Sequence, residues 1–329
     1  MNLSNKIFPA GQAVLVSPEI SAFFTSMKKN IFQRLVMPLQ ELETYYRERR
    51  KFRFESGRRL KHIHLRETFY PLFSKFLMLD RFSRKQTITV IGRQRKYREQ
   101  VIYACTHIGE NDLENIYETI RRGCWWFVGN PCVLYKSVSG LLLYLNGSIF
   151  LETSDKDDRR IAYLRAVELL KSGGSLMIFP EGARNGTVNL PVMELFPGTA
   201  KMALETNTKI VPIAIEQYGR RFIVNFGDEL LSEDFHDYTE LTQKLRDVLA
   251  TLKWEIWERE PLQSRGSLPT DYSELFRKEF EARIYPYDTP ETIERSRFHG
   301  KISSPQEAFA HLNQLIPCRE NAFLFRERH

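Results

Sequence analysis

Cysteine is scarce in this chain of 329 residues, and long apolar runs are missing. The four cysteines, Cys105, Cys124, Cys132 and Cys318, are too few and too scattered for a disulfide framework, and no two form a C-x-x-C pair. The longest apolar-rich stretch, around residues 140–145, is well short of the roughly 20 residues that a spanning helix needs. The N-terminus does not have the pattern of a secretory signal. We therefore expect a protein of a reducing, cytoplasmic compartment that does not cross a bilayer.

Disorder and fibrous repeats are excluded by composition, since 42% of the residues are hydrophobic and 27% are charged. A chain of this length buries a sizeable core, either as one large domain with appendages or as two smaller domains. The sequence contains no internal repeat and no low-complexity tract.

Positive charge is concentrated in the N-terminal third. Residues 1–100 hold 21 Lys and Arg against 8 Asp and Glu, a net charge of +13, while the whole chain carries +7. Cations and aromatic residues alternate most densely over residues 45–64. Such a segment suits an anionic surface, either lipid head groups or nucleic acid, but a solvated helix face with long cationic side chains gives the same pattern.

From about residue 85, short β-branched or aromatic runs alternate with longer helical stretches, which is typical of βαβ units and a parallel sheet. The expected strands are residues 87–91, 101–106, 125–128, 148–151, 176–179, 210–215 and 222–226. The expected helices between them are residues 111–122, 157–171 and 198–206. Pro212 lies inside one expected strand, and a proline there favours an edge strand or a bulge.

Both flanks of this α/β pattern read as helical. Residues 234–260, 271–285 and 305–316 have amphipathic helical spacing, as does much of the first 80 residues. We therefore predict a mostly parallel central sheet flanked by helices. It divides into a basic, mainly helical region (residues 1–84), an α/β core (85–230) and a C-terminal helical extension (231–329).

A histidine and an aspartate stand where an open parallel sheet binds its ligands. His107 directly follows an expected strand, and Asp112 falls in the first turn of the next expected helix. A carboxylate one turn away can bond the imidazole Nδ1 and leave Nε2 free to take a proton from a hydroxyl, which makes a general-base dyad. A capping aspartate beside a surface histidine is the alternative.

A second segment ends at the same edge of the expected sheet. The buried run that begins at Leu176 continues as Phe179-Pro-Glu-Gly-Ala-Arg184, so a carboxylate and a guanidinium follow a strand. The planar guanidinium suits phosphate or carboxylate groups.

Taken in order, five segments of the sequence resemble the motif series of the glycerolipid acyltransferases, the lysophosphatidate and glycerol-phosphate acyltransferases. They are Thr106-His-x-x-x-x-Asp112, Gly147-Ser-Ile-Phe-Leu151, Phe179-Pro-Glu-Gly-x-Arg184, Gly198-Thr-Ala-Lys-x-Ala203 and Val211-Pro-Ile-Ala-Ile215. The resemblance covers roughly residues 85–230. It implies an α/β fold and direct transfer of a fatty acyl group from acyl-CoA or acyl-carrier protein to a hydroxyl of a lysolipid acceptor.

The resemblance also assigns roles. His107 is the expected base and Asp112 its orienting group, Glu181 and Gly182 shape the acceptor site, and Arg184 grips the acceptor phosphate. The thioester is already activated, so no metal and no cofactor beyond the acyl donor is expected.

One motif departs from the family pattern. The family usually places an arginine two residues after the Gly-Ser-Ile-Phe-Leu segment, whereas this chain has Glu152-Thr153. Arg159 or Arg160 at the start of the next expected helix can substitute, or the carboxylate of Glu152 indicates an acceptor that carries a positive group or no phosphate.

The leading hypothesis is a peripheral enzyme on the inner face of the membrane, attracted by anionic lipid and not by nucleic acid. The alternative is a non-catalytic protein of the same fold that binds lipid or nucleic acid.

Overall fold

The computed structural model describes residues 29–109, 111–187, 190–260, 269–282, 293 and 297–298. Seven strands within these residues form one sheet in the order β1-β7-β6-β2-β5-β3-β4. The strands are β1 (Thr87–Gly92), β2 (Ile102–Cys105), β3 (Trp125–Gly129), β4 (Ser148–Leu151), β5 (Leu176–Ile178), β6 (Ile210–Tyr218) and β7 (Arg221–Phe226). The α/β class and the mostly parallel sheet predicted from the sequence are confirmed.

One antiparallel pair divides the sheet. β6, β2, β5, β3 and β4 are parallel, whereas β7 pairs antiparallel with β6 and parallel with β1. A tight turn at Gly219, whose φ is +61°, joins β6 to β7. The carboxyl ends of the five parallel strands therefore meet at one edge, the edge at which His107 was expected.

Pro212 was expected at an edge strand or at a bulge, and the structure has the bulge. β6 lies between β7 and β2, so Pro212 is on an interior strand and not at an edge. On the β7 side the register is Ile213↔Phe226 and then Ile210↔Leu230, so two residues of one strand face three of the other. This one-residue bulge removes the need for an N–H at position 212.

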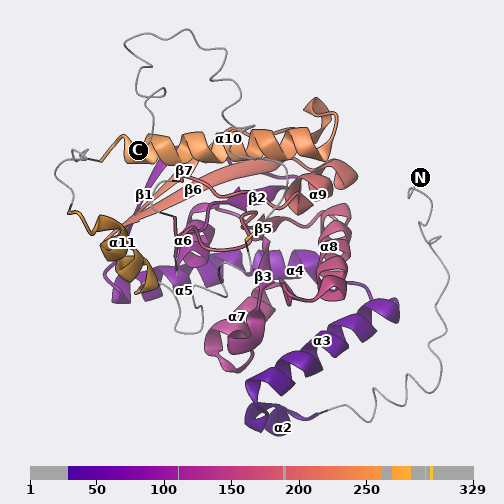
Figure 1. Ribbon diagram of the computed structural model, residues 1–329. Coiled ribbons are helices and arrows are strands. Elements are labelled where there is room, and N and C mark those ends of the chain that lie inside the picture. The colour runs from indigo at the N-terminus through magenta and orange to yellow at the C-terminus, as the bar shows by residue number, and fades with distance from the viewer. Residues whose placement is uncertain are drawn as a thin grey trace.

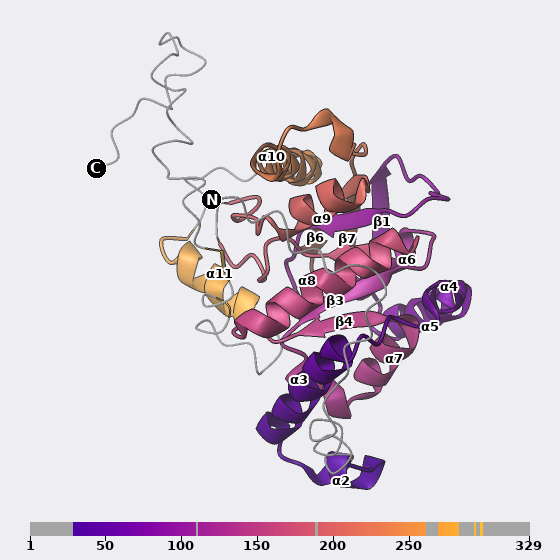
Figure 2. The same ribbon diagram turned by 90° about the vertical axis from the view of Figure 1, so that its right-hand side faces the viewer.

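Helices cover both faces of the sheet (Figures 1 and 2). The helices of the core and its C-terminal side are α6 (Asp112–Thr119), α7 (Val138–Asn146), α8 (Lys156–Lys171), α9 (Gly198–Thr206), α10 (Tyr238–Trp257) and α11 (Tyr272–Glu281). Ile102 and Ala104 point into one core, together with residues of α8, α9 and α10. Tyr103 and Cys105 point into the other, which α5 (Tyr70–Ser83), α6 and α7 help to form.

Local signals set where the predicted helices end. The helix expected over residues 111–122 stops at Thr119, because Arg121 has a positive φ of 55°. The helix expected over residues 234–260 begins only at Tyr238, after a short 3-10 turn, η2 (Ser232–Asp234). Asp237 caps it by accepting hydrogen bonds from the backbone N–H groups of Thr239 and Glu240. The helix expected over residues 305–316 and Cys318 lie outside the described residues.

The basic N-terminal region packs against the sheet at two places. Its helices are α2 (Ile31–Val36), α3 (Leu39–Glu55), α4 (Ile63–Thr68) and α5. Arg81 of α5 forms a bidentate ion pair with Glu118 of α6. α3 lies beside α8 and the 3-10 helix η1 (Pro131–Lys136), next to the sheet's edge strand β4 (Figure 2).

Candidate active site

His107 and Asp112 are in contact at the carboxyl end of β2. The His107 Nδ1 and the Asp112 Oδ2 are 2.9 Å apart. The same oxygen accepts the backbone N–H groups of Ile108 at 2.5 Å and Gly109 at 2.8 Å. Asp112 is fully buried, so one carboxylate holds both the loop and the imidazole. Since a carboxylate only accepts, Nδ1 carries the proton and Nε2 keeps its lone pair.

Two further contacts fix the position of His107, one to its ring and one to its backbone. Its ring stacks on Phe179, with centroids 4.2 Å apart and planes at 19°. The His107 carbonyl accepts the Asn185 N–H at 2.7 Å. Burial lowers the pKa of His107, against the hydrogen bond to Asp112, and the Arg184 charge lowers it further. The imidazole is therefore neutral near pH 7, which is the form that a general base requires.

Glu181 is fully buried, and both its oxygens are occupied by backbone groups. Oε1 accepts the His107 N–H at 3.1 Å and Oε2 accepts the Met193 N–H at 2.8 Å. Burial raises its pKa to about 7. The Glu181 side chain therefore links the segment after β5 to the backbone of His107. Gly182 supplies the sharp turn beside it, with a φ of +69° and an N–H donated to the Phe179 carbonyl.

Arg184 lies with the dyad, whereas Arg159 and Arg160 lie elsewhere. The Arg184 Nε donates to the Gly109 carbonyl at 3.3 Å, inside the His107–Asp112 loop. Arg159 donates to the Thr153 carbonyl, and Arg160 faces Asp157 and the Phe54 ring of α3. The two arginines of α8 thus contact the residues before this helix, the helix itself and α3.

Two arginines near these segments escaped the sequence analysis. Arg84, which follows α5, donates to the Asn111 side chain, so a second guanidinium reaches the dyad loop. Arg50 of α3 bonds Asp158, and the same Asp158 carboxylate accepts the Glu152 N–H. The only sequence signal for these two arginines is that they lie in the basic first 100 residues. Their partners are 27 and 108 residues away, too far along the chain to form a sequence motif.

The described residues contain no group of three or more His, Cys, Asp or Glu side chains that could hold a metal ion. In the same residues, no helix combines the length and apolar character needed to span a membrane.

Part of the chain is similar to known proteins. The Acyltransferase family model matches residues 87–216. The 1-acyl-sn-glycerol-3-phosphate acyltransferase of Borreliella burgdorferi is 28% identical over 124 residues, which are 38% of this chain and 46% of that protein. The enzyme of the same name from Saccharomyces cerevisiae is 23% identical over 148 residues, 45% of this chain and 46% of that protein. The alignments thus span about half the length of these relatives.

A solved structure is similar as well. The crystal structure of the 1-acyl-sn-glycerophosphate acyltransferase from Thermotoga maritima aligns with a TM-score of 0.47 and 17% identity, over 74% of this chain and 91% of that one. The matched segment of the present chain contains all of His107, Asp112, Glu181 and Arg184. Residues 87–216 are thus similar to the Acyltransferase family, and the two relatives named above are glycerolipid acyltransferases.

Proposed function

We propose that the protein is an O-acyltransferase that moves a fatty acyl group from an acyl thioester to a hydroxyl of a lysophospholipid, glycerol phosphate or related lysolipid. The observation that carries the proposal is the His107–Asp112 pair. Its Nδ1 is held by a buried carboxylate, and its Nε2 is left to accept a proton. The match to the Acyltransferase family model and the two curated relatives support acyl transfer to a glycerolipid.

The proposed reaction needs one base and returns it unchanged. Nε2 of His107 takes the proton of the acceptor hydroxyl as the oxygen attacks the thioester carbonyl. The carbon–sulfur bond then breaks, the new ester forms, and the imidazolium gives its proton to the departing thiolate. Asp112 stabilises the transient imidazolium through Nδ1. Arg184, beside the dyad, is the proposed ligand for an acceptor phosphate.

Glu181 and Gly182 are proposed to position the site and not to touch the acceptor. Both oxygens of Glu181 are used by backbone N–H groups, one of them that of His107. Its substitution should therefore act through the placement of the imidazole.

The test is release of free thiol from acyl-CoA, and separately from acyl-carrier protein, in the presence of lysophosphatidate. We expect His107→Gln to lower kcat by about 10²–10⁴-fold, the usual contribution of a general base. His236→Gln removes an exposed histidine that precedes α10 and should leave the rate unchanged. Equal activity of the His107→Gln variant and the wild type would overturn the proposal.

An apolar stripe on α5 supports attachment to a membrane surface. Leu72, Phe76, Leu79 and Phe82 recur at helical spacing and are 70%, 48%, 64% and 60% exposed. Leu65 of α4, which contacts α5, and Phe69 between these two helices are exposed as well, as are Leu141 and Leu145 of α7, which contacts α4. Contiguous apolar patches rimmed by cations are typical of membrane-docking faces.

We therefore propose that the basic N-terminal region docks on anionic lipid at the cytoplasmic face of a membrane. In flotation with vesicles containing anionic lipid, Leu72→Ser/Leu79→Ser should lose most of its bound fraction. Leu275→Ser on α11 removes an exposed leucine that lies off this surface and should keep binding. Equal flotation of the stripe variant and the wild type would place the docking surface elsewhere.

A further inference from the structure

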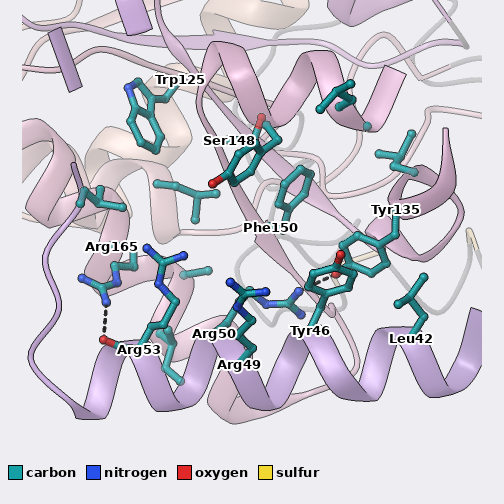
Figure 3. A pocket seen from close by; sticks show the side chains of 18 of the residues that line it. Leu42, Tyr46, Arg49, Arg50, Arg53, Trp125, Tyr135, Ser148, Phe150 and Arg165 are labelled. Atoms are coloured by element: carbon teal, nitrogen blue, oxygen red, sulfur yellow. Dashed lines mark hydrogen bonds between the residues drawn. The ribbon is translucent and has the colours of Figure 1, made fainter. Parts of the chain in front are cut away.

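A cavity of about 720 Å³ lies between α3 and the edge strand β4 (Figure 3). Arg49, Arg50 and Arg53 project from α3 toward it, and Trp125 and Phe150 face them from the sheet. None of the residues that line it belongs to the His107–Asp112 loop or to the segment from Phe179 to Arg184. The cavity is thus separate from the candidate active site.

The walls of the cavity are cationic. Eight arginines and two lysines line it, and the described lining residues include no Asp or Glu. Part of this charge is neutralised from outside the lining, because Arg50 pairs with Asp158 and Glu43, and Arg165 pairs with Glu168.

Other cations of the cavity have no such counterpart. In the described chain, Arg49, Arg53, Arg59 and Lys61 have no carboxylate oxygen within 4.0 Å. Burial lowers the pKa of Arg53, and the neighbouring charge of Arg49 lowers it further. A cluster of like charges beside an apolar wall is unfavourable by itself, so an anion bound among them would be stabilised.

Apart from Ser137 and Ser148, the remaining lining is apolar or aromatic. Leu42, Trp125, Leu134, Ile149 and Phe150 contribute to it. A ligand that is anionic throughout would leave this surface in contact with water, whereas an apolar ligand would leave the guanidinium groups without partners. The volume falls within the roughly 300–1,000 Å³ of pockets that hold one small molecule.

We propose that this cavity binds a phosphate-headed amphiphile with a single acyl chain, its phosphate among Arg49, Arg53 and Arg59 and its chain against the β4 edge. Guanidinium groups bind phosphate oxygens in pairs of parallel hydrogen bonds, and Trp125, Ile149 and Phe150 offer the chain an apolar wall. The site is independent of the proposed catalytic step, since it shares no residue with the dyad.

The test uses the full chain carrying His107→Gln, so that no turnover occurs. Short-chain lysophosphatidate is titrated below its micelle concentration, and binding is followed by calorimetry and by tryptophan fluorescence, since Trp125 lines the cavity. We expect saturable binding of one molecule per chain. A monoacylglycerol of the same chain length, which lacks the phosphate, should not saturate.

The decisive variants change charge at the cavity and away from it. Arg53→Gln/Arg59→Gln should raise Kd by about tenfold or more, because the loss of even one charge-assisted hydrogen bond has an effect of this size. Arg98→Gln/Arg220→Gln removes the same charge at exposed positions outside the cavity and should bind as the parent does. Equal Kd values for the two variants would overturn the proposal, provided that their melting temperatures agree.

Other phosphate sources give distinct outcomes. Free CoA carries phosphates without an acyl chain. Saturable binding of CoA, with none of lysophosphatidate, would make the cavity a nucleotide site and refute the amphiphile. Competition by glycerol phosphate as effective as that by the lipid would refute the role of the apolar wall. If the wild-type protein released no thiol from acyl-CoA, the catalytic proposal would fail, whereas the binding measured in the His107→Gln chain would be unaffected.

Discussion

The burial of Glu181 should make the stability of the protein depend on pH in a way that one substitution removes. The side chain is fully buried, and burial raises its pKa from 4.5 to about 7. The folded protein therefore holds this proton more tightly than the unfolded chain does. The stability that it contributes is fully present below pH 4.5 and is lost as the pH rises through about 7.

The size of the effect follows from the two pKa values. The difference between 4.5 and about 7 corresponds to about 3 kcal/mol of unfolding free energy, at about 1.4 kcal/mol for each pH unit. That is a large part of the roughly 5–15 kcal/mol by which proteins are stable. Glu114, whose pKa burial also raises to about 7, adds a loss of the same sign to the wild type.

The assay is urea unfolding of the wild type and Glu181→Gln at about pH 4.5 and about pH 8, conditions that bracket the titration. Glutamine cannot titrate, so the difference in unfolding free energy between the two proteins should shift by about 3 kcal/mol in favour of the variant at the higher pH. All other titrating groups, Glu114 included, cancel in this difference. Glu233→Gln, at an exposed position in η2, should show no such shift.

Two results would refute this reasoning. A difference that stays constant with pH would mean that Glu181 titrates alike in the folded and unfolded chains. A shift of the opposite sign would mean that the two backbone N–H groups on its oxygens outweigh burial and hold its pKa below 4.5.

Three further predictions test other parts of the structure. Because burial lowers the pKa of His107, the acid limb of kcat/KM should have its midpoint below 6.5, and a midpoint above it in the pH profile would contradict the assignment. Lys253→Met leaves the carboxylate of Glu216 without its buried partner, so the free energy of unfolding should fall by about 3–5 kcal/mol. A loss of under about 1 kcal/mol in chemical denaturation would show that the ion pair is dispensable. Gly147→Ala, at a φ of +106° and with its Cβ 2.7 Å from an indole ring, should cost about 1–3 kcal/mol in thermal unfolding. Gly198→Ala, which meets nothing within 4 Å, should be neutral, and equal costs at the two glycines would count against the steric argument.

The parts of the fold that sequence predicted well are those with local signals. The strand over residues 148–151 and the helix over residues 198–206 have the bounds expected. Each is delimited by its own neighbours, a glycine with positive φ before the first and Asn207 in the left-handed region after the second. β6 is three residues longer than expected, because its last residues are ordered by pairing with β7.

The candidate site divides in the same way. His107 and Asp112 are five residues apart and follow one strand, so their contact was predictable from spacing. Glu181 was expected at the acceptor site, but its partners are the backbone N–H groups at positions 107 and 193, which no side-chain pattern encodes. Arg50 meets Asp158 across 108 residues, a pairing that exists only once α3 has packed beside α8.

The net charge of +13 in the first 100 residues overstates what those cations can do at a membrane. Arg50 and Arg81 are held in ion pairs within the protein, and other arginines face the cavity under α3. An accessible cation contributes about 1 kcal/mol near anionic lipid, and this attraction is screened by salt. Burying one large apolar side chain contributes about 1.5–3 kcal/mol, so the four exposed side chains of α5 outweigh several cations. If the stripe carries the attachment, vesicle binding should largely survive about 0.5 M salt, whereas dissociation at that concentration would assign it to the cations.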